Sequence, residues 1–147
     1  MVKHLTIITS LLFILAFQCE RNISFPLNEA FQIKMDEIQS NKMLKVMVSP
    51  EEVAEDSRCP KNTTCVWAGQ VKIKFSLWDA SKEAQHFVLS LRDDKPDEAM
   101  QVVDGYTYQL MAVDPYPVEG SEVANEDYMI TLLVRKAEAG DGRLDEQ

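Results

Sequence analysis

The 147-residue chain has few of the residue types from which most enzyme active sites are built. It holds two histidines, His4 and His86, and three cysteines. Neither a phosphate-cradling G-x-x-x-x-G-K segment nor a dinucleotide-binding glycine fingerprint occurs, so no cofactor is indicated. Catalysis would have to be built on His86 and acidic residues, because a nucleophile needs a base and an orienting group. We therefore expect a non-enzymatic protein, and we retain a small hydrolase or metal-dependent enzyme using His86 as an alternative.

Basic residues are scarce as well. The chain has 15 lysines and arginines against 24 aspartates and glutamates, which gives a formal net charge of −9. Because such a surface repels phosphate backbones, we expect no nucleic-acid partner. Acidic clusters at residues 51–56, 93–98 and 126–127 contain the oxygen ligands that calcium prefers, but none has the spaced form of a calcium loop. We interpret them as solvated loop charge and expect no metal.

Long apolar runs are limited to one, at the N-terminal end. The run extends from Leu5 to Phe17, and Lys3 and His4 precede it. Its length matches the core of a signal peptide and is too short to span a bilayer as a helix. We therefore predict that residues 1–18 are a signal peptide and that the protein is exported. A buried helix of the folded domain is the alternative.

A cysteine follows this run at a position typical of lipid attachment. Residues 15–19, LAFQC, resemble the lipobox of bacterial lipoproteins, although Gln18 stands where Gly, Ala or Ser is usual. The resemblance implies that Cys19 is acylated and anchors the protein to a membrane of the cell envelope. We expect the outer membrane, with the domain facing the periplasm or the cell surface. Cysteine arithmetic agrees, because pairing Cys59 with Cys65 leaves Cys19 over; ordinary secretion with Cys19 free or paired is the alternative.

The middle of the chain alternates apolar and polar residues, which places successive side chains on opposite faces of a strand. The clearest example is residues 71–77, where Val71, Ile73 and Phe75 alternate with Lys72 and Lys74. Similar runs cover residues 31–35, 44–48, 87–91, 106–112 and 128–134, with a weaker one at 100–103. This pattern predicts an all-β antiparallel sandwich of about seven strands, immunoglobulin-like or related.

The same pattern suggests boundaries and local details of this domain. We expect a tether over residues 19–28, the sandwich over residues 29–136 and a disordered tail over residues 137–147. Residues 50–56 could form one helical turn, because Pro50 suits a first turn and glutamates follow it. Four residues are expected to protect sheet edges from pairing, namely Lys45, Lys72, Lys74 and Pro115.

The segment EDSRCPKNTTCVWAG, residues 55–69, carries the other two cysteines. Five residues separate Cys59 from Cys65, and no second pair completes a zinc site. A redox-active pair would usually have C-x-x-C spacing. Outside the reducing cytosol the two thiols should oxidise, so we predict a disulfide that closes a short loop. Trp67 is then free to cover the bridge, and Gly69 permits a bulge or a close backbone approach.

This segment also resembles a signature of small uncharacterised bacterial envelope proteins, many of them predicted lipoproteins. The shared residues are Asp-Ser-Arg-Cys-Pro at 56–60 and Cys-Val-Trp-Ala-Gly at 65–69. The resemblance spans roughly residues 31–134. It implies the same kind of fold and an envelope location, and it carries no activity.

We therefore interpret the protein as a binding module whose loops, residues 56–69 and 114–121, face an unknown protein or glycan partner. The candidate loop surface comprises Asp56, Arg58, Trp67 and Tyr116, and Tyr106, Tyr108 and Trp78 are further candidate contacts if they fall on the wet faces of their strands. A structural interpretation of Arg58 stays open, in which it folds back on a carboxylate and binds loop carbonyls. A further alternative is an enzyme inhibitor that presents the Cys59–Cys65 loop.

Overall fold

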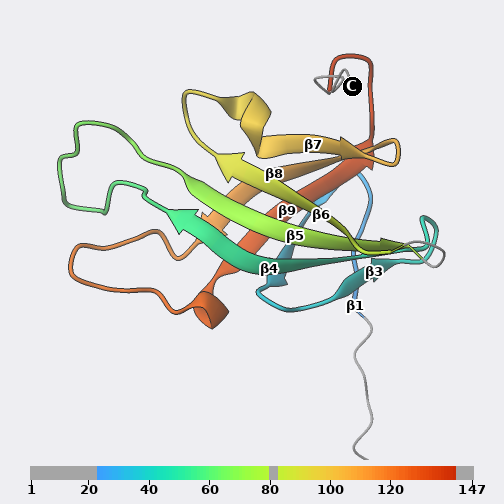
Figure 1. The fold of residues 1–147 in the computed structure, drawn as a ribbon, viewed down its shortest axis with the longest axis horizontal. Coiled ribbons are helices and arrows are strands. Elements are labelled where there is room, and N and C mark those ends of the chain that lie inside the picture. The colour runs from blue at the N-terminus through green and yellow to red at the C-terminus, as the bar shows by residue number, and fades with distance from the viewer. Residues whose placement is uncertain (1–22, 80–82, 142–147) are drawn as a thin grey trace, which may run out of the picture.

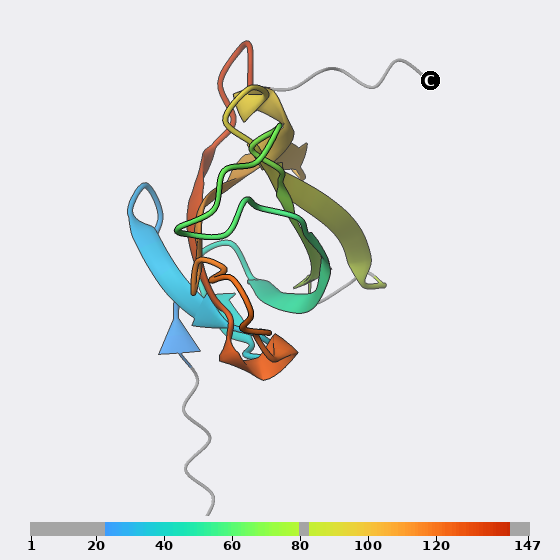
Figure 2. The same cartoon turned by 90° about the vertical axis from the view of Figure 1, so that its left-hand side faces the viewer.

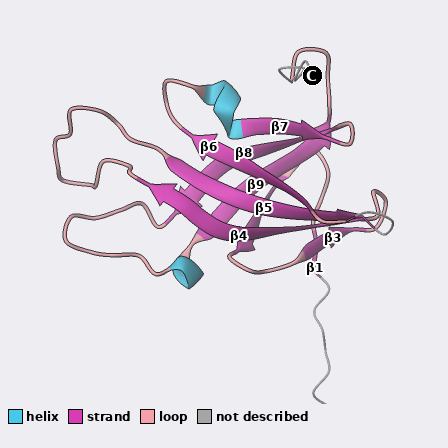
Figure 3. Ribbon diagram, viewed as in Figure 1, coloured by secondary structure: helices cyan, strands magenta, loops and turns pink. Residues whose placement is uncertain are grey.

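The computed structural model describes residues 23–79 and 83–141, which form two packed β-sheets (Figure 1). One sheet has the strand order β1-β3-β4-β5-β6 and the other the order β2-β9-β8-β7. The strands are β1 (Ile23–Ser24), β2 (Ala30–Lys34), β3 (Gln39–Asn41), β4 (Val46–Asp56), β5 (Val71–Asp79), β6 (Gln85–Leu91), β7 (Met100–Val103), β8 (Tyr106–Asp114) and β9 (Met129–Lys136). The only helices in the described residues are two 3-10 turns, η2 (Pro96–Ala99) and η3 (Asn125–Asp127) (Figure 3).

The predicted all-β, sandwich-like fold is confirmed, with nine strands in the described residues where about seven were expected. The core lies between the two sheets, because the longer strands bury side chains on the face that meets the other sheet. Val71, Ile73 and Phe75 of β5 are completely buried, as the alternation predicted. Phe87 of β6 and Tyr108 of β8 meet across the core with ring centroids 5.3 Å apart. The two extra strands, β1 and β3, are too short to show a period in the sequence.

The expected helical turn at residues 50–56 is wrong, because this segment is the second half of β4. The whole strand β4 pairs with β5, from Val46 opposite Asp79 to Asp56 opposite Val71. Register shifts between Pro50 and Glu52, and again between Val53 and Glu55, accommodate the irregular residues. Pairing with a long central strand therefore outweighs the local preference of Pro50 and two glutamates for a helix start.

The expected edge role of Lys72 and Lys74 is also wrong. Both lie on β5, which β4 and β6 flank on either side. Their ammonium groups form ion pairs with Glu55 at 2.8 Å and with Glu51 at 3.4 Å on the neighbouring strand β4. Alternation shows which face of a strand is wet, but it does not show the order of strands in the sheet.

The folded part of the chain extends beyond both expected boundaries. Phe25, within the segment expected as a tether, is 1% exposed and stacks on Phe31. At the other end, Asp141 accepts hydrogen bonds from Arg135 and from the Thr107 hydroxyl at 3.0 Å, so Asp141 is bonded to the sandwich. The expected signal peptide, Cys19 and the rest of the tail lie outside the described residues. Within those residues, no helix has the length and apolar character needed to cross a membrane.

Candidate functional site: the cysteine-loop end

Two long loops meet at one end of the sandwich, which we call the cysteine-loop end (Figure 1). They are the β4–β5 connection, residues 57–70, and the connection after β8, residues 115–124. The backbone N–H of Lys61 donates a hydrogen bond of 2.9 Å to the carbonyl of Pro117, and Lys61 forms an isolated parallel bridge with Val118. In Figure 2 both loops face the viewer in front of the sheets. The two predicted binding loops therefore form one joined surface.

The predicted disulfide between Cys59 and Cys65 is confirmed. Their Cα atoms are 5.9 Å apart, within the ordinary range for a bridge. Two further bonds shape the same loop, from the N–H of Cys59 to the carbonyl of Ala68 at 2.9 Å and from the Thr63 hydroxyl to the carbonyl of Pro60 at 2.7 Å. The loop is thus held by a covalent link and by its own backbone contacts.

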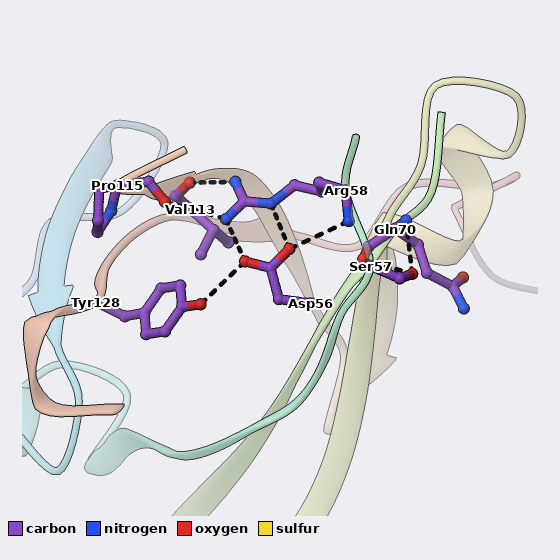
Figure 4. A network of polar contacts seen from close by, with 7 residues as sticks. All are labelled: Asp56, Ser57, Arg58, Gln70, Val113, Pro115 and Tyr128. Carbon is purple, nitrogen blue, oxygen red and sulfur yellow. Dashed lines mark hydrogen bonds and ion pairs between the residues drawn. The ribbon is translucent and has the colours of Figure 1, made fainter. Parts of the chain in front are cut away.

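Arg58 and Asp56 form the base of this surface (Figure 4). The guanidinium group of Arg58 donates to both carboxylate oxygens of Asp56, at 2.8 and 2.6 Å. It also donates to the carbonyl of Val113 at 2.6 Å, near the end of β8, and to that of Pro115 at 3.1 Å, in the loop that follows. The side chains are only 8% and 10% exposed. Burial and the bonds to backbone carbonyls leave Arg58 and Asp56 little free surface for a partner. Their prediction as contact residues is therefore wrong, and the structural interpretation of Arg58 holds.

The charge of Asp56 is maintained against its burial. Desolvation alone would raise the pKa of this carboxyl, but hydrogen bonds and charge from Arg58, together with a 3.0 Å hydrogen bond from the Tyr128 hydroxyl, lower it below its ordinary value. Burial, and next the hydrogen bond to Asp56, raise the pKa of Tyr128. At the base of the site, the charges of Arg58 and Asp56 thus balance each other, and both carboxylate oxygens of Asp56 accept hydrogen bonds.

Gly69 permits the close backbone approach that the sequence suggested. Its φ is +75°, and a Cβ atom built there would lie 1.8 Å from the carbonyl oxygen of Ser57. The N–H of Ser57 in turn donates to the carbonyl of Gln70 at 2.8 Å. The two ends of the cysteine loop can therefore close on each other only where no side chain intervenes.

Exposed apolar side chains cover this well-held frame. Val66 is fully exposed, Trp67 is 57% exposed and Val118 is 45% exposed. Tyr116 is 38% exposed, and its ring lies under the guanidinium carbon of Arg58 at 4.9 Å and near the ammonium of Lys61 at 5.7 Å. Trp67, expected to cover the bridge, instead leaves more than half of its surface to solvent. Trp67 and Tyr116 thus remain candidate contact residues.

A shallow pocket of about 220 Å³ opens beside these loops. Its lining includes Arg58, Gly69, Met111 and Tyr116. Sequence reasoning missed Met111, which is 45% exposed and lies in a register shift of β8 between Leu110 and Ala112. Strict alternation would not reveal this bulge, since it requires the register of the neighbouring strand.

The other candidate aromatic contacts are partly or completely buried. Tyr108 is 1% exposed and belongs to the core, so it does not lie on a wet face and is not a contact residue. Its burial raises the pKa of its hydroxyl. Tyr106 and Trp78 are half-buried. The residues 106–112 alternate, but Tyr108 lies on the face that meets the other sheet.

His86, the centre of the enzymatic alternative, lies on the edge strand β6 and is half-exposed. Its Nδ1 atom is 2.8 Å from the Ser76 hydroxyl and 3.3 Å from a carboxylate oxygen of Glu51, and Ser76 donates to Glu51. A catalytic triad instead places the nucleophile and the acid on opposite ring nitrogens. Here both contact the same nitrogen, and Ser76 is completely buried. The cluster resembles a structural network on the outer face of the sheet.

The acidic clusters at residues 51–56 and 93–98 contain carboxylates that form local ion pairs. Arg92 bonds Asp94 at 2.8 Å and Lys95 bonds Glu98 at 2.9 Å. In the part of the chain that the structure describes, no three His, Cys, Asp or Glu side chains are placed to hold one metal ion.

Comparison with known proteins adds no assignment: no family model, curated protein or solved structure matches this chain.

Proposed function

We propose that this is an exported, lipid-anchored protein of the cell envelope that binds a protein or glycan partner through the cysteine-loop end, without enzymatic activity. One observation carries the binding role. Exposed Val66, Trp67, Tyr116 and Val118 lie on two loops that a disulfide and a buried ion pair hold in place. Aromatic side chains on a pre-organised frame favour binding, because little conformational entropy is lost on association.

The anchor part of the proposal is supported by the apolar run ending at Cys19 and by the disulfide, which suits an oxidising compartment. Mass analysis of the membrane-extracted protein tests it. We expect a mature chain that begins at residue 19 and carries acyl chains, and loss of membrane association in the Cys19→Ser variant. An unmodified residue 19 on the mature protein would overturn the anchor.

Affinity capture from the native membranes, after mild cross-linking, tests the binding role. Three forms are compared: the intact protein, the double variant Val66→Ser/Trp67→Ser, and the control Val88→Ser. Val88 is 48% exposed on β6, outside the two loops. We expect the intact protein and the control to retain a common partner that the double variant loses. Equal capture by all three forms would exclude the loop surface.

An inhibitor that presents the Cys59–Cys65 loop is the second candidate. It is favoured by the full exposure of Val66 beside a disulfide-closed loop. If the captured partner is an enzyme, its turnover rate should fall when the intact protein is added. The rate should stay unchanged when the double variant Val66→Ser/Trp67→Ser is added instead. Unchanged turnover would leave simple binding as the function.

A further inference from the structure

The exposed large apolar side chains of the described residues fall mainly into two separated groups. Five belong to the cysteine-loop end, namely Val66, Trp67, Met111, Tyr116 and Val118. Four others, Ile23, Ile38, Met43 and Met47, lie around the edge strand β1, its neighbour β3 and the start of β4. The proposed binding role uses only the first group.

The second group lies close to the predicted lipid. β1 begins at Ile23, so four residue steps separate it from Cys19, and a fully extended chain spans at most about 14 Å over that distance. The sandwich therefore cannot move far from an anchored Cys19. The sheet edge that carries β1 therefore stays near the membrane, since β1 is the first strand after the tether.

The turn between β3 and β4 has the composition of a lipid-contacting loop. It reads Lys42-Met43-Leu44-Lys45, and Met43 is 83% exposed while both lysines are exposed. Lysine stems pack along apolar groups while their ammonium groups stay at the headgroups. The rest of this acidic chain is repelled by anionic lipid, so two lysines flanking an exposed methionine favour this turn as the contact.

We propose that the surface formed by Ile38, Met43 and Met47, with Lys42 and Lys45, rests on the anionic lipid surface to which Cys19 is anchored. This inference depends on the proposed lipid anchor. It also places the binding surface. β4 begins beside the turn and ends at Asp56, and its 11 residues extend about 33 Å. The cysteine-loop end is therefore held beyond the lipid contact, free to meet its partner (Figure 1).

Fluorescence quenching by brominated lipids tests the contact. The acylated protein, with Trp67 and Trp78 replaced by phenylalanine, receives one tryptophan by Met43→Trp or, as a control, by Val118→Trp. Each form is placed in vesicles of phosphatidylethanolamine and phosphatidylglycerol with brominated chains. We expect roughly twofold quenching at position 43 and none at position 118. Equal quenching at the two positions would overturn the proposal.

A second measurement avoids the tryptophan substitutions. Amide hydrogen exchange of residues 42–45 should slow at least about threefold in the vesicle-bound acylated protein relative to the free Cys19→Ser form, while residues 115–120 stay unchanged. If the protein is acylated but residues 42–45 exchange equally, only the lipid contact is wrong. If Cys19 carries no lipid, the anchor fails and the contact fails with it.

Discussion

At the scale of single residues, Arg58 joins three segments of the chain through one guanidinium group. It binds Asp56 at the end of β4, Val113 in β8 and Pro115 in the following loop. Because the side chain is 8% exposed, its charge is balanced by Asp56 and not by water. Removal of either partner leaves a buried charge without compensation.

We expect Arg58→Met to lower the free energy of unfolding by about 3–5 kcal/mol, because the carboxylate of Asp56 loses its partner. Urea denaturation measures this loss. The double variant Arg58→Met/Asp56→Asn should lose less than the sum of the single variants. Arg92→Met is the control: its partner Asp94 is 67% exposed, so we expect a loss below about 1 kcal/mol. Equal losses for the two arginines would contradict a structural role of Arg58.

Gly69 allows a pair of matched substitutions. In Gly69→Ala the new methyl group meets the Ser57 carbonyl, so we expect a loss of about 2–4 kcal/mol in unfolding free energy. In Gly120→Ala the φ is +74° with no atom within 4 Å, so only the backbone preference of about 1 kcal/mol is lost. Thermal or urea unfolding distinguishes them, and similar losses would show that the close approach has no energetic weight.

At the scale of elements, β1 shows that a two-residue strand can define a boundary of the domain. It pairs in parallel with β3, and the following Phe25 enters the core, where the amide of Asn41 binds its carbonyl at 3.0 Å. This short element therefore limits the length of the predicted tether.

We expect Phe25→Ala to cost about 3–5 kcal/mol of unfolding free energy, as for a core aromatic. Ile23→Ala, at a side chain 40% exposed, should cost less than about 1 kcal/mol. Urea unfolding of both variants provides the measurement. A small effect at Phe25 would mean that the segment is a tether after all.

The cysteine loop is the second element with a measurable contribution. Its six-residue separation predicts about 2 kcal/mol of stabilisation from the restricted unfolded chain. We expect Cys59→Ala/Cys65→Ala to lose this amount in equilibrium unfolding, and to bind the captured partner more weakly because the loop is less ordered. Unchanged affinity at lower stability would show that the bridge serves the fold alone.

At the scale of the whole molecule, stability should decrease in acid. The folded-state pKa of Asp56 is lowered, and that of Glu55 is lowered to about 2 by hydrogen bonds from Lys72, Gln70 and Ser57. A lowered carboxyl pKa gives stability that is complete above the unfolded value near 4 and is lost as the pH falls through the folded value.

Unfolding free energies measured between pH 7 and pH 2 test this dependence. We expect the intact protein to lose stability below about pH 4, and Asp56→Asn to show a shallower slope there because one of the linked protons is removed. Identical slopes would mean that Asp56 keeps its ordinary pKa in the folded protein.

Much of this architecture was predictable from local residue order. Alternation of apolar and polar residues at 71–77 and 128–134 determines which side chains can share a buried face. The all-β class was therefore predictable from the order of residues along the chain. The spacing of Cys59 and Cys65 permits a bridge and disfavours zinc. These inferences hold because side-chain period and short loop closure are local properties of a chain.

Only the tertiary structure decided which residues the site exposes. The sequence left both a surface role and a structural role open for Arg58, and backbone carbonyls 55 and 57 positions away bind its guanidinium group. Met111 became accessible through a bulge, and Phe25 moved from an expected tether into the core. The strand order made β5 central and removed the edge role of its lysines. Each of these outcomes depends on contacts between segments distant in sequence, which residue order alone does not specify.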